Sequence, residues 1–204
     1  MTMIEVAGMR YKADLTAGAL KVAESRIIAG LLLRDVDDEG WKDAIVKRNV
    51  LQARSPATAR RLTTLVKGRL MTMGPDLWRI IRDGKGSVAT HAVLAAAVKH
   101  SPLLGDFLDL VVREQYRLFA KTLATKLWDE YLTGCQERDP DMPQWNESTR
   151  KRLRSSVFQS LAQAGYIEST RSLKLQNVHV ADQVLHYLKA QGEEYVLRCI
   201  QVAP

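Results

Sequence analysis

The sequence predicts a mainly α-helical, multi-helical protein, and three features of the chain support this. Apolar residues recur at three- and four-residue intervals in most segments, which is the spacing of one helix face. Two Ser-Pro pairs, Ser55-Pro56 and Ser101-Pro102, provide helix starts, because a serine oxygen caps free amides and proline suits the first helical position. Glycine and proline punctuate the chain between these segments. At 204 residues and 46% hydrophobic content, the chain can form one large domain or two small ones.

The first predicted helix covers residues 20–33 and contains an acidic residue, Glu24, on its apolar face. The apolar stripe consists of Leu20, Ala23, Ile27 and Leu31. A carboxylate on such a face is costly unless it is paired. We therefore expect Glu24 to form a buried ion pair with an arginine, and the alternative is a solvent-lined cleft.

The next helices are a short one through residues 41–46 and a longer one that begins at Ser55-Pro56 and is expected to run to about Met73. The apolar face of the longer helix is formed by Ala59, Leu62, Val66, Leu70 and Met73. Its opposite face carries Arg60, Thr64 and Lys67 at positions i, i+4 and i+7. This helix should therefore be amphipathic with a basic outer face.

Helical patterns continue to about residue 138, and a non-helical segment follows. The expected elements are a short helix ending at Asp83-Gly84, a buried alanine-rich helix over 87–99, a helix starting at Ser101-Pro102, and a helix through Leu123, Leu127, Tyr131 and Cys135. Residues 139–143, Asp-Pro-Asp-Met-Pro, suit neither a helix nor a buried strand and predict a linker. We expect two lobes, an N-terminal helical bundle domain over residues 1–138 and a C-terminal helical domain over residues 144–204.

The C-terminal lobe should open with a helix from about Asn146 to Ala164, which Gly165 ends. Residues 166–180 alternate weakly between polar and apolar side chains, a pattern compatible with a small β-hairpin. A helix followed by a hairpin is also the order of a recognition helix and its wing, so a winged-helix-like lobe is one interpretation. A last helix around residues 184–188 and an apolar segment over 195–202 close the chain.

The whole net charge of the chain lies in residues 42–70. This segment has a single acid, Asp43, and a net charge of +7, equal to that of the entire chain. Its cations are Lys42, Lys47, Arg48, Arg54, Arg60, Arg61, Lys67 and Arg69. A concentrated cationic strip favours a polyanion as partner, because each phosphate neutralised by Lys or Arg releases a condensed counterion. Nucleic acid is the polyanion we expect.

A second basic cluster stands near the start of the helix expected over 146–164. It consists of Arg150, Lys151, Arg152 and Arg154. Exposed cations there oppose the helix dipole at a cost of roughly 0.3 to 1 kcal/mol each, whereas a bound phosphate would use both the dipole and the side chains. Any one of these residues is also explained by a solvated helix face. Together with residues 42–70, the cluster favours contact with nucleic acid.

Sequence motifs of catalysis and of cofactor or metal binding are missing. The run Asp83–Ser87 resembles a phosphate loop, but it lacks the upstream glycine of GxxxxGK[ST] and follows no strand, so we interpret it as a helix-to-helix turn. The four histidines fit no metal-ligand spacing, and the acids of residues 35–39 suit a helix-entry loop better than a cation site. We therefore expect no cofactor, no metal, no small-molecule substrate and no enzymatic activity.

The sequence also indicates a cytoplasmic protein. The longest uncharged apolar stretch, residues 86–98, is shorter than the ~20 residues of a membrane-spanning helix, and the first residues show no secretory signal. Cys135 and Cys199 are far apart in sequence and near no histidine pair, which fits neither a disulfide framework nor a zinc site. We expect both thiols to be reduced and no membrane to be a partner.

Several segments resemble one protein family. They are residues 24–29 (ESRIIA), 47–52 (KRNVLQ) and 54–62 (RSPATARRL), followed by Arg69-Leu70. These runs are similar to BrxA, a small component of BREX bacteriophage-exclusion systems. The resemblance is most distinctive over residues 20–72, and it implies a mainly helical, two-lobed, non-enzymatic DNA-binding protein of a phage-defence locus. It supplies no catalytic motif, and the residues that match the basic stretch of the family are Arg48, Arg54, Arg60 and Arg61.

Three functions remain as hypotheses. The first is a sequence-tolerant double-stranded DNA-binding protein that contacts phosphates through Arg48, Arg54, Arg60, Arg61, Lys67 and the cluster over 150–154, and that recruits or positions other BREX proteins. The second is a protein adaptor whose basic strip docks on an acidic partner. The third is an RNA-binding helical bundle, although exposed aromatic residues for base stacking are not evident.

Overall fold

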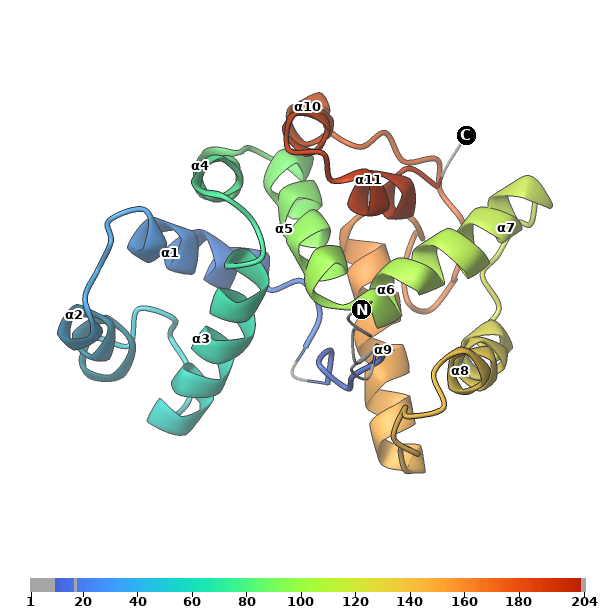
Figure 1. Cartoon of the computed structure of the whole chain (residues 1–204), viewed down its shortest axis with the longest axis horizontal. Coiled ribbons are helices and arrows are strands. Elements are labelled where there is room, and N and C mark those ends of the chain that lie inside the picture. The colour runs from blue at the N-terminus through green and yellow to red at the C-terminus, as the bar shows by residue number, and fades with distance from the viewer. Residues whose placement is uncertain (1–9, 17, 203–204) are drawn as a thin grey trace, which may run out of the picture.

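The computed structural model describes residues 10–16 and 18–202, and it is mainly helical (Figure 1). The helices are α1 (Val22–Leu32), α2 (Asp38–Lys42), η1 (Asp43–Lys47), α3 (Pro56–Leu70), α4 (Pro75–Asp83), α5 (Ser87–His100), α6 (Pro102–Asp106), η2 (Phe107–Val112), α7 (Arg113–Arg117), α8 (Lys126–Arg138), α9 (Glu147–Gln163), α10 (Asp182–Ala190) and α11 (Glu194–Ile200). The two η segments are π-helical turns, and η2 joins α6 to α7 in one continuous arm. The predicted fold class is confirmed.

Helix α5 forms the centre of the molecule and packs against α1, α3, α4, α6, α10 and α11. All residues from Ala92 to Val98 are buried, and four of these seven are alanines. Small side chains allow neighbouring helices to approach α5 from every side, which explains why this helix shows no polar face. Figure 1 shows α1 to α4 on one side of α5 and α9 and α11 on the other.

A second centre of packing joins the arm to α8 and α9. The ring of Phe107 lies 5.2 Å from the ring of Trp128 and 5.2 Å from the ring of Tyr131, both in edge-to-face geometry, and 6.0 Å from Phe158. Edge-to-face pairs add about 0.5 to 1.5 kcal/mol to the burial of each ring. This cluster fixes the basic start of α9 relative to the arm.

The helix-start signals of the sequence are confirmed for α3 and α9. The Ser55 hydroxyl accepts a hydrogen bond from the Thr58 N–H, and the Asn146 side chain accepts one from the Thr149 N–H. Gly165 follows α9 with φ +87°, the left-handed conformation expected at a helix end. Ser101 precedes Pro102 as predicted but does not cap α6, because its hydroxyl donates to the Asp14 carboxylate at 2.7 Å.

The apolar stripe predicted for the first helix is partly wrong. Ala23 is exposed and Ile27 is half-buried, whereas Ile28, Ala29 and Leu31 are buried. Helix α1 packs against both α3 and α4, so its buried face is wider than, and rotated from, the stripe that spacing indicated. The five residues predicted for the buried face of the next long helix, in contrast, are all buried, although Met73 lies beyond the end of α3.

The segment after α9 contains little extended structure. Within the described residues, Ile167 and Leu175 form one isolated antiparallel bridge and Thr122 and Lys174 form another. The small hairpin considered from the sequence is therefore reduced to single bridges. The second bridge ties the segment 166–176 to the end of the arm.

Residues 139–143 are non-helical, as the linker prediction requires. The Asp139 carboxylate is buried and accepts hydrogen bonds from the backbone N–H groups of Arg10 at 2.8 Å and Tyr11 at 3.0 Å. Helix α10 packs on α4 and α5, and α11 packs on α5, α6 and η2. The division into domains over residues 1–138 and 144–204 stays a prediction.

Candidate nucleic-acid interface

The first basic surface, here called the α3 surface, lies on α3 and the segment before it. Its residues are Arg48, Arg54, Arg60, Arg61 and Lys67. The four arginines are exposed, and within the described chain only Arg48 has an acidic partner, Asp43 at 2.7 Å. The Ser55 cap and the buried stripe of α3 fix Arg60 and Arg61 on the outer side of the helix.

Lys67 is held differently from the arginines of the α3 surface. Its ammonium nitrogen lies 4.4 Å from the ring centroid of Trp41, a cation–π contact between α3 and α2. Together with Arg60 it borders a shallow cavity of about 420 Å³ between α3 and the α2–η1 segment. Trp41 therefore positions a cation at the rim of this groove.

Arg69 does not belong to the α3 surface, although it counts toward the charge of residues 42–70. Its side chain is buried, with 2% of its surface exposed. Its guanidinium donates to the carbonyl oxygens of Ala19 at 2.7 Å and Gly18 at 3.3 Å. Burial lowers the pKa of Arg69 to about 10, against the opposing influence of Asp14. This arginine anchors the N-terminal segment to α3 and cannot contact a phosphate.

The second basic surface, here called the α9 surface, consists of Arg150, Lys151, Arg152 and Arg154. Asp129 of α8 lies between two of these residues, 3.4 Å from the Arg150 guanidinium and 3.7 Å from that of Arg154. Lys151 pairs with Glu147 one turn earlier. Arg152 has no acidic partner within the described residues. That Asp129 partly neutralises this cluster could not be predicted from the sequence, because the packing of α8 beside α9 depends on the path of the loop between them.

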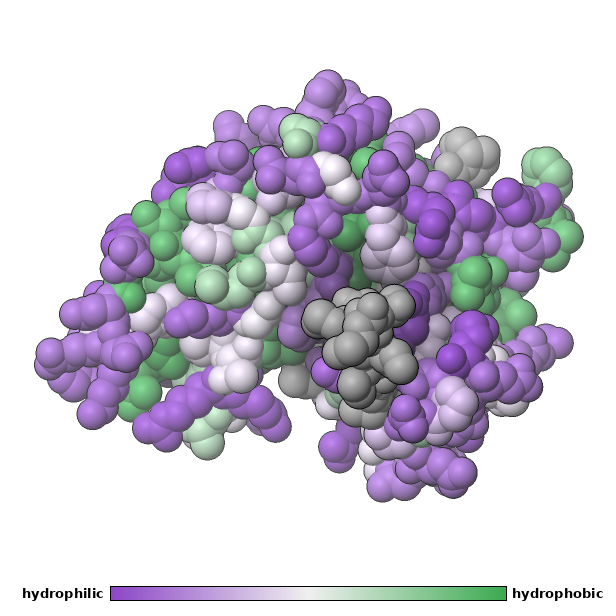
Figure 2. All heavy atoms as spheres, in the orientation of Figure 1, coloured by the Kyte–Doolittle hydropathy of each residue, from purple (hydrophilic) through white to green (hydrophobic). Residues whose placement is uncertain are grey.

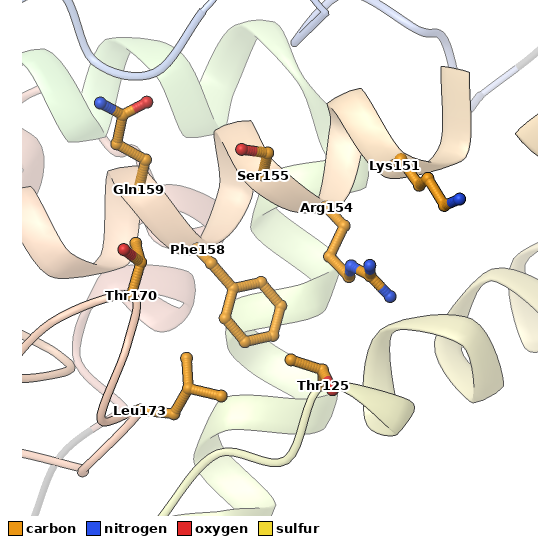
Figure 3. Close-up of a pocket in the computed structure, with 8 residues that line it drawn as sticks. All are labelled: Thr125, Lys151, Arg154, Ser155, Phe158, Gln159, Thr170 and Leu173. Atoms are coloured by element: carbon orange, nitrogen blue, oxygen red, sulfur yellow. The ribbon is translucent and has the colours of Figure 1, made fainter. Parts of the chain in front are cut away.

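A cavity of about 470 Å³ opens beside the α9 surface (Figure 3). Its walls are formed by Thr125, Lys151, Arg154, Ser155, Phe158, Gln159, Thr170 and Leu173. The lining contains two cations, three hydroxyl groups and one amide, and no carboxylate. Cations and hydroxyls are the donors that bind phosphate oxygens in nucleic-acid complexes. The cavity is therefore chemically suited to a phosphate group.

The helices that carry the two basic surfaces begin toward the same edge of the molecule. Figure 1 shows the N-terminal ends of α3 and α9 at the lower edge of the view, on opposite sides of α5. The space-filling view in Figure 2 shows a notch between these two ends, with hydrophilic side chains on both sides. A rod-shaped polyanion that crosses the notch would meet both helix starts.

Glu24 departs from its predicted environment. It is half-buried rather than buried, and its carboxylate lies 3.5 Å from the ammonium group of Lys21, not from an arginine. It also lines a cavity of about 400 Å³ between α1, α5 and α9. A partly exposed pair of this kind contributes at most about 1 kcal/mol. The expected buried pair with an arginine is therefore wrong, and the position of Glu24 beside a cavity corresponds to the alternative, a carboxylate in a cleft.

The cysteines and histidines form no metal-ligand cluster in the described part of the chain. Cys135 and Cys199 are both free thiols and buried, and burial raises the pKa of Cys199 to about 12. His91 is buried on α5 and His100 stands at its end. Among the described residues, no helix is both long enough and apolar enough to span a membrane.

Sequence reasoning missed one feature that the structure shows at the end of the arm. Leu118 and Phe119 are exposed there, at 64% and 91%, between the cations Arg117 and Lys121. The sequence signal was the run Arg-Leu-Phe-Ala-Lys, but no glycine or proline marks it as the end of a helix.

The fold and the site together define a class: a helical protein with two cationic helix surfaces on either side of a central buried helix. The family model of BrxA matches residues 9–192. The chain belongs to the BrxA family.

Individual relatives support this assignment over most of the chain. It is 53% identical to the BREX protein BrxA of Paramagnetospirillum magneticum (strain ATCC 700264 / AMB-1), covering 95% of this chain and 98% of the relative. It is 31% identical to the BREX protein BrxA of Escherichia coli O9:H4 (strain HS), covering 92% and 88%. A crystal structure of an uncharacterized protein from Magnetospirillum magneticum superposes with a TM-score of 0.89 at 50% identity, covering 95% of this chain and all of that one.

Proposed function

We propose that this protein is a non-enzymatic, sequence-tolerant double-stranded DNA-binding component of a BREX phage-defence system, acting in the cytoplasm with other BREX proteins. The relatives at 53% and 31% identity both carry the name BREX protein BrxA, which supports the place in such a system. The DNA-binding part of the proposal rests on the residues of this chain.

The observation that carries DNA binding is the exposure of the cations in the charged segment 42–70. Arg54, Arg60 and Arg61 project to solvent with no acidic partner in the described chain. Unpaired, exposed arginines gain most from a phosphate backbone, because binding releases condensed counterions. Contacts to phosphate carry no sequence information, so binding through these residues tolerates different base sequences.

The α9 surface supplies the second half of the proposed contact. Arg152 projects outward, and Lys151 and Arg154 border the carboxylate-free cavity described above. The Asn146 cap leaves the first turn of α9 close to these side chains, and a phosphate there is favoured by the helix dipole. The two surfaces together offer enough cations to neutralise about five phosphates.

Titration of labelled duplex DNA, single-stranded DNA and RNA by fluorescence anisotropy across salt concentrations tests the proposal. If about five phosphates are neutralised, log K should fall with log salt with a slope of roughly −4 to −5. Random-sequence duplexes should bind with similar affinity. Absence of duplex binding at low salt, or a slope near zero, would refute the proposal, and stronger binding of RNA would favour the RNA-binding alternative.

Incubation of pure protein and plasmid with Mg²⁺ or Mn²⁺ tests the non-enzymatic part. The plasmid should remain supercoiled over hours. Reproducible nicking that follows the protein through purification would contradict it.

A further inference from the structure

The end of the arm presents two large apolar side chains to solvent. Helix α7 projects from the body of the molecule in Figure 1, and Figure 2 shows hydrophobic atoms at this outer edge. Leu118 is 64% exposed and Phe119 is 91% exposed. In the described chain the only other large apolar residues of comparable exposure are Met71 and Leu110.

Phe119 also has a backbone conformation that a phenylalanine rarely adopts. Its φ is +52°, in the left-handed region. Its N–H donates to the Tyr116 carbonyl and the Ala120 N–H donates to the Gln115 carbonyl, which together form a Schellman motif at the end of α7. Glycine is the residue that normally occupies this position. The phenyl ring itself does not stabilise this conformation, because Phe119 is 91% exposed and makes almost no contact with the protein.

The strained end is nevertheless held rigidly. The Tyr116 hydroxyl donates to the Gln176 carbonyl at 2.6 Å. Beyond the turn, the Leu123 N–H donates to the Leu173 carbonyl at 2.8 Å, and the Leu175 N–H donates to the Lys121 carbonyl at 3.0 Å. The continuous helix of α6, η2 and α7 supports the turn from behind. The turn that carries Phe119 is therefore held in a fixed position at the end of the arm.

Cations surround the exposed side chains. Arg117 and Lys121 are exposed on either side of them in the chain, and the bridge between Thr122 and Lys174 places the segment that carries Lys174 and Arg171 beside them. Glu114 and Glu168 are the acids of this region, and Glu114 lies 4.0 Å from Arg117. The net charge of this region is therefore positive. A positive charge beside exposed apolar side chains disfavours a purely apolar protein partner and favours a polyanion that also has apolar surface.

The same region adjoins the α9 surface. Thr125 follows the end of the arm in the chain, and Leu173 lies in the segment that pairs with it. Both residues also line the cavity that Lys151 and Arg154 border (Figure 3). The α9 surface is thus connected to the end of the arm through the walls of this cavity.

We propose that Leu118 and Phe119 form a wedge that inserts between base pairs of bound duplex DNA. The inference rests on the proposed DNA binding and assigns a mode to it. An apolar side chain that partly unstacks a base step exchanges its exposed surface for contact with base faces, while flanking cations hold the phosphates on both sides. The inserted duplex is kinked at that step. Insertion is easiest at flexible pyrimidine–purine steps such as TA, so the wedge adds a preference for deformable sequence without hydrogen bonds to base edges.

The test uses full-length protein and a duplex of about 20 base pairs that carries 2-aminopurine within TA steps, so that unstacking increases fluorescence. The variant Leu118→Ser/Phe119→Gly removes the wedge. Glycine suits the left-handed position, so this variant should melt at the same or a higher temperature than the parent. Phe119→Tyr keeps an aromatic wedge, and Leu110→Ser removes an exposed leucine elsewhere on the same arm.

The parent, Phe119→Tyr and Leu110→Ser should bind with a steep salt slope and increase the fluorescence at saturation. The double variant should keep the salt slope, bind roughly tenfold more weakly, and leave the fluorescence unchanged. If the double variant binds and unstacks like the parent, the wedge is wrong while the proposed function stands. If the parent binds no duplex, both fail. If sedimentation shows a parent dimer and a monomeric double variant, the end of the arm is an interface between copies of this chain and the wedge is again wrong.

Discussion

Arg61 and Arg69 stand eight residues apart on α3 and have opposite environments. Arg69 is buried and donates to two backbone carbonyls, whereas Arg61 is exposed. Removal of a charged donor from a buried site leaves its acceptors without partners. Arg69→Ala should therefore lower the free energy of unfolding by about 3 kcal/mol or more, measured by urea denaturation, and leave the salt slope of DNA binding unchanged at temperatures where the variant is folded.

Arg61→Ala is the matched control for Arg69. Its free energy of unfolding should stay within about 0.5 kcal/mol of the parent, and its DNA affinity should fall. The reverse pattern, with Arg61 required for stability and Arg69 required for binding, would contradict the assignment of the two arginines.

His91 makes the stability of the fold depend on pH. Its Nδ1 accepts a hydrogen bond from the Ala181 N–H at 3.1 Å, and its Nε2 faces the Ala164 carbonyl at 3.3 Å. Burial lowers the pKa of His91 from its ordinary value of 6.5. Between the lowered pKa of His91 in the folded chain and its ordinary value of 6.5 in the unfolded chain, only the unfolded chain binds the proton. The free energy of unfolding is therefore full above about pH 6.5 and falls as the pH drops below it.

The measurement is the urea midpoint at several values from about pH 8 to pH 5. His91→Gln should be less stable than the parent at pH 8 but should lose less stability on acidification. Burial also lowers the pKa of His100, which acts in the same direction. The double variant His91→Gln/His100→Gln should therefore show the smallest change of stability with pH. Burial raises the pKa of the Asp14 carboxyl, so at lower pH this group changes the stability in the opposite direction. An undiminished acid loss in the double variant would show that other groups cause it.

At the scale of whole elements, local chemistry made the starts of α3 and α9 predictable. Ser55-Pro56 and Asn146 start α3 and α9 as predicted, because capping depends on residues within one turn. The end of α3 was predicted at about Met73 but lies at Leu70, where Thr72 and Met73 already form tighter turns to Arg69 and Leu70. The end of α7 could not be predicted, since its left-handed position is occupied by Phe119 rather than glycine.

The environment of each charged residue was less predictable than the helices, because it depends on partners distant in sequence. The burial of Arg69 follows from the path of residues 18–19, and the pairing of the α9 surface follows from the packing of α8 beside α9. Sequence spacing assigns faces to a single helix but cannot show which neighbour covers them.

Asp129 limits the charge of the α9 surface and gives a prediction for this pair of helices. Asp129→Asn should release Arg150 and Arg154 and increase the affinity for duplex DNA by roughly threefold to tenfold at low salt. Its stability should change by less than about 1 kcal/mol, because the ion pairs are partly exposed. Anisotropy titrations measure the first effect and urea denaturation the second.

Glu130→Gln is the control for Asp129, because Glu130 is the next residue of α8 and pairs with Lys126 at 3.6 Å, one turn away on the same helix. It removes the same charge without releasing an arginine of the α9 surface. Equal gains from the two variants would mean that only the net charge matters and that the pairing with Asp129 has no specific effect.

For the molecule as a whole, the question is whether the α3 and α9 surfaces bind one duplex together. The starts of α3 and α9 lie toward one edge on either side of the notch seen in Figure 2. If one duplex crosses this notch, Arg60→Ala/Lys67→Ala and Arg150→Ala/Arg154→Ala should each weaken binding and shorten the salt slope by up to about two units, and their combination should shorten it further.

Melting temperatures should change little in these variants, apart from the loss of the Lys67–Trp41 contact, which contributes roughly 0.5 to 1 kcal/mol. Lys85→Ala/Lys189→Ala removes two exposed cations that belong to neither surface and should leave the slope near that of the parent. If only one pair of substitutions changes the slope, a single surface binds DNA and the other is left for a protein partner. The α3 and α9 surfaces are held in position by α5 and the buried cluster around Phe107. A change of the salt slope therefore indicates a shared duplex only if the substitutions leave this fold intact, which melting curves of the same variants establish.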